Sequence, residues 1–342
     1  MTLASTSVEP SLPRARGPLS VAVLDLLSTA PSRQQWQLDP TVDPPTDDAD
    51  PYGLDLQLAL YTCYELHYRG FAGVEPGWEW HPRLLQLRAR FEAAFLAAVR
   101  RDVGEIGPDE TAAAEMESLS VEPVDGAGPS YYLRDEGTWE QMREYFVHRS
   151  LYHLKEADPH AWVIPRLTGQ AKASFVAVEF DEYGAGRGAA IHQQLYADLM
   201  GAAGLNPNYL GYLDDVPAET LAAVNLMSLF GLHRSMRGAT IGHFAATEIT
   251  SSPGSRRLAE ALERMGAPEP CIHFYREHVE ADAVHEQVVR ADVVGDLVAT
   301  EPRLDRDVVF GIRARDVVEN RLADHVMSRW TAGQTSLLRP VS

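Results

Sequence analysis

Apolar residues recur at helical spacing along most of the chain, with polar residues on the opposite faces. The segments with this pattern are residues 54–68, 81–100, 138–157, 169–180, 189–205, 217–252, 255–266, 269–299 and 304–330. Alternation typical of a strand is scarce, and its best example is "SFVAVEF" at residues 174–180. Because long helical patterns flank this stretch, we predict that it is helical too. The pattern therefore predicts a single all-α domain, a bundle of about eight to ten helices.

Composition changes at both ends of the helical region. Residues 1–53 form a predicted N-terminal arm or linker, partly extended, because residues 31–53 are rich in Pro and Asp. Within this arm, "PLSVAVLDLLSTA" predicts a short helix or a tail that docks on the domain; Asp25 interrupts it and argues against a signal peptide. The predicted domain covers residues 54–335, and residues 336–342 form a tail.

One long stretch inside the domain lacks a strong helical pattern. Residues 103–137 contain Gly, Pro and Asp and predict an excursion that serves as a lid or a partner contact. A homodimer could use this excursion or the N-terminal arm.

Overall composition narrows the class of protein. Of the 342 residues, 45% are hydrophobic and 23% charged, as in a soluble globular protein. The net charge of −19 argues against nucleic acid or an anionic membrane as a partner. No apolar run approaches the roughly 20 residues needed to span a bilayer. Two cysteines make a disulfide framework improbable, and we predict a cytoplasmic protein.

The segment "EHVEADAVHEQ", residues 277–287, raises the question of metal binding. At about 100° per residue, His278, Asp282 and His285 fall within roughly 60° of one another on a helix. Two imidazoles and one carboxylate on one face suit a first-row metal. A solvated charged surface and a mononuclear iron site of two His and one carboxylate both remain open on this segment alone.

Three further segments supply acidic or imidazole side chains, each of which also has a simpler interpretation. Glu182 and His192 flank glycines that let a helix bend and so re-aim one of the two side chains. The simpler interpretation is an ordinary glycine-containing kink without a functional role. Glu156 lies at a helix end before Pro159. Glu248 stands among small and apolar residues, where a buried acid is costly without a partner, unless the side chain is exposed.

Taken together, these segments resemble the haem-oxygenase-like diiron oxidases and oxygenases, known as iron-containing redox enzymes. The similarity covers residues 54 to about 335. The stretches that carry it are "YELHYRGFAGVEPGWEW", "PRLTGQAKASFVAVEFDEYGAGR", "LYADLMGAAGL", "HRSMRGATIGHFAATEITSS" and "FYREHVEADAVHEQ".

The resemblance implies a fold, a ligand set and a cofactor. The fold is a haem-oxygenase-like helical bundle. The ligands of two iron ions are Glu156, Glu182, His192, His278, Asp282 and His285, and Glu248 is a further carboxylate that joins the metals when O₂ binds. The resemblance also implies O₂ as co-substrate, a peroxo-diferric intermediate and an external reductant. A carboxylate-rich centre disfavours haem, although His153, Tyr152 and His243 could each be considered as an axial ligand.

The reaction is less closely defined by the sequence. The quoted stretches resemble the N-oxygenating branch, so we predict N-oxygenation of an amino-acid-derived amine or guanidine in specialised metabolism. Oxidative C–C or C–H cleavage of a small amine or acid is the alternative, and a metal-free binding protein or cofactor-free enzyme is a third class. Arg166, Arg234 and Arg237 are candidates to hold a substrate carboxylate, or else form structural ion pairs.

Overall fold

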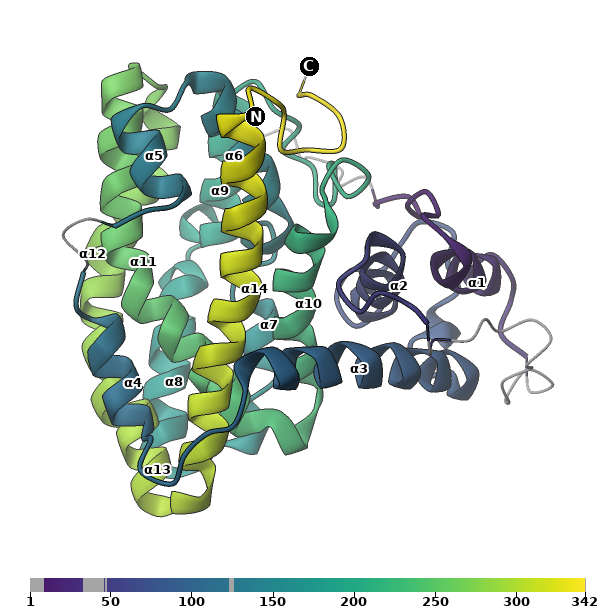
Figure 1. The fold of residues 1–342 in the computed structure, drawn as a ribbon, viewed down its shortest axis with the longest axis horizontal. Helices are drawn as coiled ribbons and strands as arrows, with labels where there is room; N and C mark the ends of the chain where they lie inside the picture. The colour runs from purple at the N-terminus through teal and green to yellow at the C-terminus, as the bar shows by residue number, and fades with distance from the viewer. Residues whose placement is uncertain (1–8, 33–45, 47, 123–125, 342) are drawn as a thin grey trace.

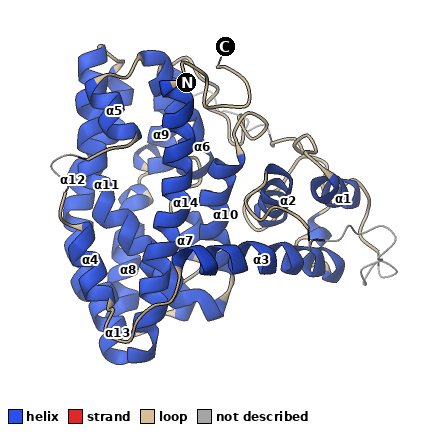
Figure 2. Cartoon of the chain, in the orientation of Figure 1, coloured by secondary structure: helices blue, strands red, loops and turns tan. Residues whose placement is uncertain are grey.

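A computed structural model describes residues 9–32, 46, 48–122 and 126–341. Within these residues the regular structure is entirely helical (Figure 2), which confirms the predicted all-α bundle. "SFVAVEF" lies inside a helix, as predicted. The principal helices are α1 (Pro18–Leu27), α2 (Leu54–Glu65), α3 (Pro82–Val103), α4 (Ala112–Leu119), α5 (Pro129–Asp135), α6 (Trp139–His153), α7 (Asp158–Ala161), α8 (Gly169–Glu182), α9 (His192–Ala202), α10 (Ala218–Leu232), α11 (Arg237–Met265), α12 (Glu269–Val288), α13 (Asp296–Thr300) and α14 (Asp305–Thr331).

Three long helices, α11, α12 and α14, run side by side along the length of the bundle (Figure 1), and α11 packs extensively on both others.

Side-chain and backbone caps define several helix ends. Thr138 caps α6, and Gln141 completes the reciprocal capping box. Gly266 ends α11 in the left-handed conformation. A π-helical stretch, Val289–Gly295, links α12 to α13.

Helices α11 and α14 approach each other at backbone distance. A Cβ atom on Gly242 of α11 would overlap the carbonyl oxygen of Val308, and one on Gly311 of α14 would overlap that of Ala239. Each helix therefore needs glycine where it faces the other, and the spacing of the pair is fixed at both points.

The N-terminal helix α1 packs on α2, beside the long-helix bundle (Figure 1). Leu19, Val23 and Leu27 join the same apolar cluster as residues of α2 and α3. The Asp55 carboxylate accepts hydrogen bonds from the backbone N–H groups of Leu19 and Ser20, at 2.9 and 2.8 Å, and so caps α1. A short helix was one of the two predictions for this segment, and helix α1 is what the structure shows. Residues 33–45 and 47 of the predicted linker lie outside the described residues, and the division at residues 53 and 335 stays a prediction.

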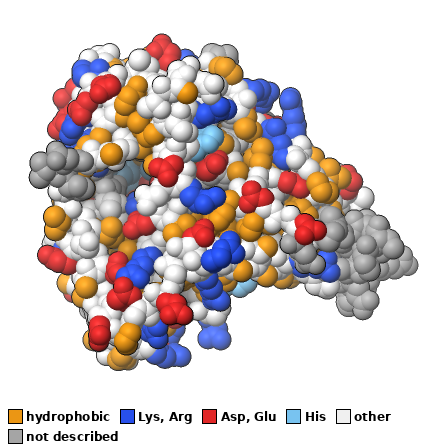
Figure 3. All heavy atoms as spheres, in the orientation of Figure 1, with side chains coloured by type: hydrophobic (Ala, Val, Ile, Leu, Met, Phe, Trp, Pro, Cys, Tyr) orange, Lys and Arg blue, Asp and Glu red, His pale blue; other side chains and the backbone are white. Residues whose placement is uncertain are grey.

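The stretch 103–137 contains more helix than its composition suggests. Helices α4 and α5 both pack on α11 and α14. Its service as a lid or partner contact remains a prediction. On the face drawn in Figure 3, acidic and basic side chains are interspersed, with apolar side chains scattered among them. None of the helices in the described part of the chain combines the length and apolar composition needed to cross a bilayer.

Candidate metal centre

The seven side chains that the sequence proposes as ligands lie in the interior, between 2 and 7% exposed. They come from five places in the fold. Glu156 lies in the turn between α6 and α7, Glu182 is the last residue of α8, and His192 is the first of α9. Glu248 lies in α11. The remaining three, His278, Asp282 and His285, share the buried face of α12, as helical periodicity predicts.

The glycine-rich segment between α8 and α9 brings Glu182 and His192 together. The chain leaves α8 through two short 3₁₀ turns, and Gly184 adopts a positive φ of 70°. The predicted bend is thus a complete break between two helices. It places His192 Nδ1 2.6 Å from Glu182 Oε2, a contact that one continuous helix would not allow.

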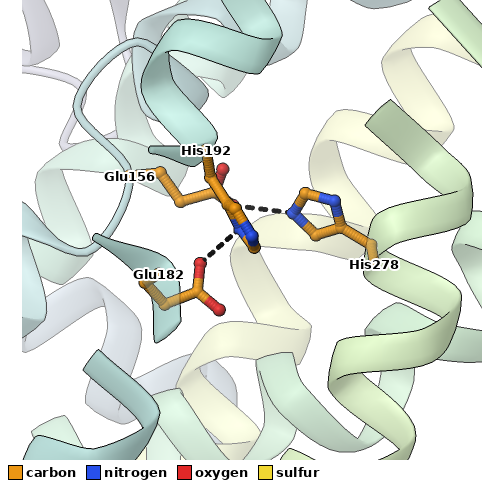
Figure 4. Close-up of side chains that lie close together, drawn as sticks. All are labelled: Glu156, Glu182, His192 and His278. Atoms are coloured by element: carbon orange, nitrogen blue, oxygen red, sulfur yellow. Dashed lines mark ion pairs between the residues drawn. The ribbon is translucent and has the colours of Figure 1, made fainter. Parts of the chain in front are cut away.

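The first cluster consists of Glu156, Glu182, His192 and His278, which point toward one another in Figure 4. One ligand atom from each lies within 4.8 Å of the others. His278 Nδ1 lies 2.8 Å from the Phe274 carbonyl oxygen, so this nitrogen donates its proton there. In the neutral ring Nε2 then carries no proton and is available to bind a metal ion, and it faces Glu156 Oε1 at 3.6 Å. A backbone hydrogen bond of this kind fixes a metal-binding histidine's tautomer.

The second cluster consists of Glu182, Glu248, Asp282 and His285, again with one ligand atom from each within 4.8 Å. His285 Nδ1 lies 3.5 Å from Glu182, 3.2 Å from Glu248 and 3.6 Å from Asp282, so this nitrogen faces the centre. On the other side of the ring, Nε2 lies 3.4 Å from the carboxylate of Asp181, which is largely exposed. Asp181 can therefore orient His285 from outside the cluster.

Glu182 belongs to both clusters. Its Oε2 faces His192 of the first cluster, and its Oε1 faces His285 of the second. A carboxylate placed in this way has one oxygen on the side of each cluster, so the two clusters adjoin at Glu182 and together have the donors to hold two metal ions.

The protein alone does not satisfy this centre. Glu156 Oε2, His192 Nδ1, His278 Nε2 and Asp282 Oδ2 are buried and make no well-formed hydrogen bond. Buried polar atoms are rarely left in this state, and each exception calls for an explanation such as a bound ion. Metal ions ligated by these atoms would supply the missing partners.

The electrostatics point the same way. Burial lowers the pKa of a histidine, yet the facing carboxylates raise the pKa of His278 to about 10 and that of His285 to about 11. Burial, together with Asp282 and Glu182, raises the pKa of Glu248 to about 8 despite its hydrogen bond with His285. Without a metal, the cluster therefore takes up protons to offset its negative charge. Divalent cations can replace those protons.

The donor set suits iron. Four carboxylates, Glu156, Glu182, Glu248 and Asp282, match the +4 charge of two Fe(II) ions. The imidazoles of His192, His278 and His285 favour iron over magnesium or calcium. The residues present therefore fit the predicted pair of iron ions. The assignment of each residue as a ligand, and the absence of haem, stay predictions.

Two neighbouring side chains were not among the predicted ligands. Glu179, one turn before Glu182, is 2% exposed, and both its carboxylate oxygens lack hydrogen bonds. Burial and the negative charges of Glu182 and Glu248 raise its pKa well above the usual range. His153 Nδ1 lies 2.8 Å from Glu156 Oε1 and supports that carboxylate. In the sequence, only the (i, i+3) spacing of Glu179 and Glu182 indicates that Glu179 lies on the same helix face as a predicted ligand.

The three arginines proposed as substrate contacts lie against other partners. Arg166 donates to the carbonyl oxygens of Gly231 and Leu232 at the end of α10. Arg237 pairs with Glu301, and Arg234 is exposed. Arg166 and Arg237 thus make contacts within the protein, in keeping with a structural role. Substrate contact by any of the three arginines stays a prediction.

The fold and this centre define a helical-bundle protein with a buried site suited to two metal ions. Comparison with protein families matches residues 143–319 to the family described as iron-containing redox enzyme, and the chain belongs to that family. This confirms the resemblance drawn from the sequence. The matched region contains all seven predicted ligands. A search of curated proteins found no match.

Proposed function

We propose that the protein is a non-haem diiron oxygenase that uses O₂ and an external reductant. The observation that carries the proposal is the position of Glu182, which belongs to both of the two buried clusters of candidate metal ligands. A single cluster would suit a mononuclear site equally well.

Bound iron would supply the electrons and open coordination positions that O₂ chemistry needs. The chain's own residues hold and orient that pair. Glu182 would help to hold both ions, the Phe274 carbonyl orients His278 so that Nε2 faces the centre, and Asp181 orients His285. Glu248, raised in pKa by burial, can hold a proton at its carboxyl group when it is not ligating.

We further propose that the reaction is N-oxygenation of an amino-acid-derived amine or guanidine. The support for this is the similarity of the quoted sequence stretches to the N-oxygenating branch. The same centre would also serve oxidative C–C or C–H cleavage, and the product distinguishes the two. Gain of oxygen on nitrogen supports the first, and loss of a carbon fragment or of hydrogen supports the second.

The experiment that tests the diiron proposal is anaerobic loading with Fe(II), followed by metal analysis and rapid mixing with O₂. We expect about two iron ions per chain, because two clusters of four donors are present, and a transient visible absorption after mixing. His278→Ala and His285→Ala, one from each cluster, should each reduce iron uptake. Unchanged uptake in both variants would refute the proposed centre.

A further inference from the structure

A groove on the surface of the bundle lies against the first cluster of candidate ligands. Its volume is about 590 Å³, which is the size of a small-molecule site. Part of its lining comes from α9, and another part from Arg69 and residues 207–209. The groove shares no lining residue with the cavity of about 250 Å³ that His278 lines, so the two hollows are separate.

Gln193 connects the groove to that cluster. The residue lines the groove and directly follows His192 at the start of α9. Gln193 Nε2 donates to the backbone carbonyl oxygen of Glu156 at 2.8 Å. One peptide bond and one hydrogen bond therefore link the groove wall to two candidate ligands. Because electron transfer weakens steeply with distance, a donor in this groove would be well placed to reduce metal ions held at the cluster.

Arg69 presents a positive charge to the groove. Its guanidinium lies over the Tyr209 ring, 4.2 Å from the ring centroid. Nη2 donates to the carbonyl oxygen of Leu154 at 3.1 Å and to Oε1 of Gln193 at 2.6 Å. Both acceptors are uncharged, so these bonds orient the guanidinium without neutralising it. A cation held in this way suits a ligand with delocalised negative charge.

Amide groups make up much of the polar lining. They belong to Gln193, Gln194 and Asn208, and each amide offers both donors and an acceptor. Asp198, the one acid in the lining, accepts from Gln194 Nε2 at 2.8 Å. Among the described residues beyond its own helical turn, none comes within 4 Å of a Cβ atom placed on Gly201, so the groove is open beside α9. An open groove with this edge suits a flat heterocycle that carries hydrogen-bond donors and acceptors.

The proposed oxygenase needs an external electron donor. That donor must reach the centre without displacing the molecule being oxygenated, which calls for a site of its own. Two ferric ions take up two electrons, one each. A donor that releases two electrons in one encounter meets this requirement.

We propose that this groove is the site of the electron donor and that the donor is a reduced flavin. The inference rests on the proposed oxygenase function. The anion of the fully reduced flavin would give up two electrons and one proton to become the oxidised flavin, and two Fe(III) ions would each gain one electron. Arg69 would stabilise the negative charge of the reduced ring, and the amides of Gln194 and Asn208 would pair with its imide edge. The proton would pass to solvent at the open side of the groove.

Binding is measured first in the metal-free protein, where iron plays no part. Flavin mononucleotide is titrated calorimetrically, without oxygen, in its reduced and oxidised forms. We expect one saturable site per chain and about tenfold tighter binding of the reduced form, because only the anion forms a charge-assisted bond with Arg69. Arg69→Gln should make the two forms bind equally. Arg101→Gln, at an exposed position on α3, should leave the preference unchanged.

Two substitutions at one position test whether the groove is the site. Gly201→Trp would place an indole ring in the groove and should weaken binding of both forms by at least about tenfold. Gly201→Ala adds one methyl group where there is open space, so it is the matched control and should leave binding unchanged. Riboflavin, which lacks the phosphate, should bind about as tightly as flavin mononucleotide, because the groove is expected to recognise the ring.

The ferric iron-loaded protein then tests electron transfer. On mixing without oxygen, one reduced flavin should be oxidised for every two iron ions, as the flavin absorbance and the iron content would show. Gly201→Trp should slow this reaction by the same factor by which it weakens binding. Reduction by dithionite, which is too small to need the groove, should be unaffected.

Several results would overturn the inference. They are no saturable binding of either form, binding that survives in Gly201→Trp, binding that inorganic phosphate abolishes and riboflavin does not show, or a bound reduced flavin that the ferric protein does not oxidise. Two iron ions without flavin binding refute this inference alone. Flavin binding in a protein that takes up no iron instead refutes the oxygenase and leaves the binding site.

Discussion

Two adjacent residues, Lys155 and Glu156, enter two buried polar clusters of opposite character. Lys155 Nζ lies 2.9 Å from Glu65 Oε2 and above the rings of Tyr61 and Tyr68. Glu65 Oε1 also accepts from the Tyr209 hydroxyl at 2.7 Å. Glu156 instead joins a centre in which carboxylates outnumber histidines and several buried donor and acceptor atoms lack partners.

The difference separates a charge cluster that is complete in itself from one that suits added cations. The Lys155–Glu65 pair is electrically neutral and supplies its own hydrogen bonds, so nothing need be added to it. The metal centre has an excess of negative charge that it offsets with protons on His278, His285 and Glu248. Burial alone does not distinguish the two clusters, whereas the balance of charge and partners does.

The largest expected effect is the loss of metal from the unbalanced cluster. Glu182→Gln removes the carboxylate common to both groups of ligands, so iron content should fall from about two ions per chain to below one. Anaerobic equilibrium dialysis with metal analysis measures it. His285→Asn affects the second group alone and should leave about one ion. Full iron occupancy in Glu182→Gln would show that the two clusters do not share this carboxylate.

Removing the cation of the balanced cluster should destabilise the fold. Lys155→Met leaves Glu65 buried without its counter-charge, and breaking such a pair costs about 3–5 kcal/mol in the free energy of unfolding. Urea denaturation of the metal-free protein measures this. Iron content should stay near two ions per chain, because Lys155 is not one of the candidate ligands.

The chain's only other lysine supplies the control for that experiment. Lys172 is half-buried on α8, and Lys172→Met should change the unfolding free energy by less than about 1 kcal/mol. If both lysine variants lose stability equally, the Lys155–Glu65 pair is not the cause.

The smallest expected effect is the release of protons when Fe(II) binds, which measures the charge that distinguishes the two clusters. At pH 7, the pKa values of about 10 for His278, about 11 for His285 and about 8 for Glu248 leave all three protonated without metal. Ligation removes these protons, and Glu182 also raises the pKa of His192, so loading with Fe(II) should release at least about three protons per chain. Anaerobic calorimetry in buffers of different ionisation enthalpy measures the release. No proton release would contradict the assigned charges.

The same pKa values set the sign of a pH dependence. All three are raised above their unfolded values, so their contribution to the stability of the metal-free protein is complete at low pH. For Glu248 it is lost as the pH rises toward about 8, and for His278 and His285 as it rises from 6.5 toward about 10 and 11. The stabilisation by iron should therefore increase between pH 6 and 8, as a comparison of melting temperatures would show.

Much of the fold followed from the sequence because helical periodicity is local. It predicted the helices and the single face of α12 that carries His278, Asp282 and His285. The division of the ligands into two clusters did not follow, because the double role of Glu182 depends on how α8, α9, α11 and α12 pack. Both His192 and His285 face Glu182 only in the folded chain.

Long-range partners explain why the arginine contacts were not apparent. Arg166 donates to carbonyl groups 65 and 66 residues away, and Arg237 pairs with an acid 64 residues away. Arg315, which lines a cavity together with His278, lies in a charged stretch of α14 that resembles any solvated helix in sequence. Glu179 and Glu182 likewise cannot be told apart in the sequence. Only the tertiary packing leaves the Glu179 carboxylate without a hydrogen bond while Glu182 faces two histidines.

The two glycine contacts between α11 and α14 have a mechanical consequence. One helix carries Glu248 and Thr250, and the other carries Arg315. Gly242 and Gly311 bring the two backbones into direct contact, which leaves the helices little room to slide past each other. The Glu248 carboxylate and the Arg315 guanidinium are therefore carried on one closely packed pair of helices.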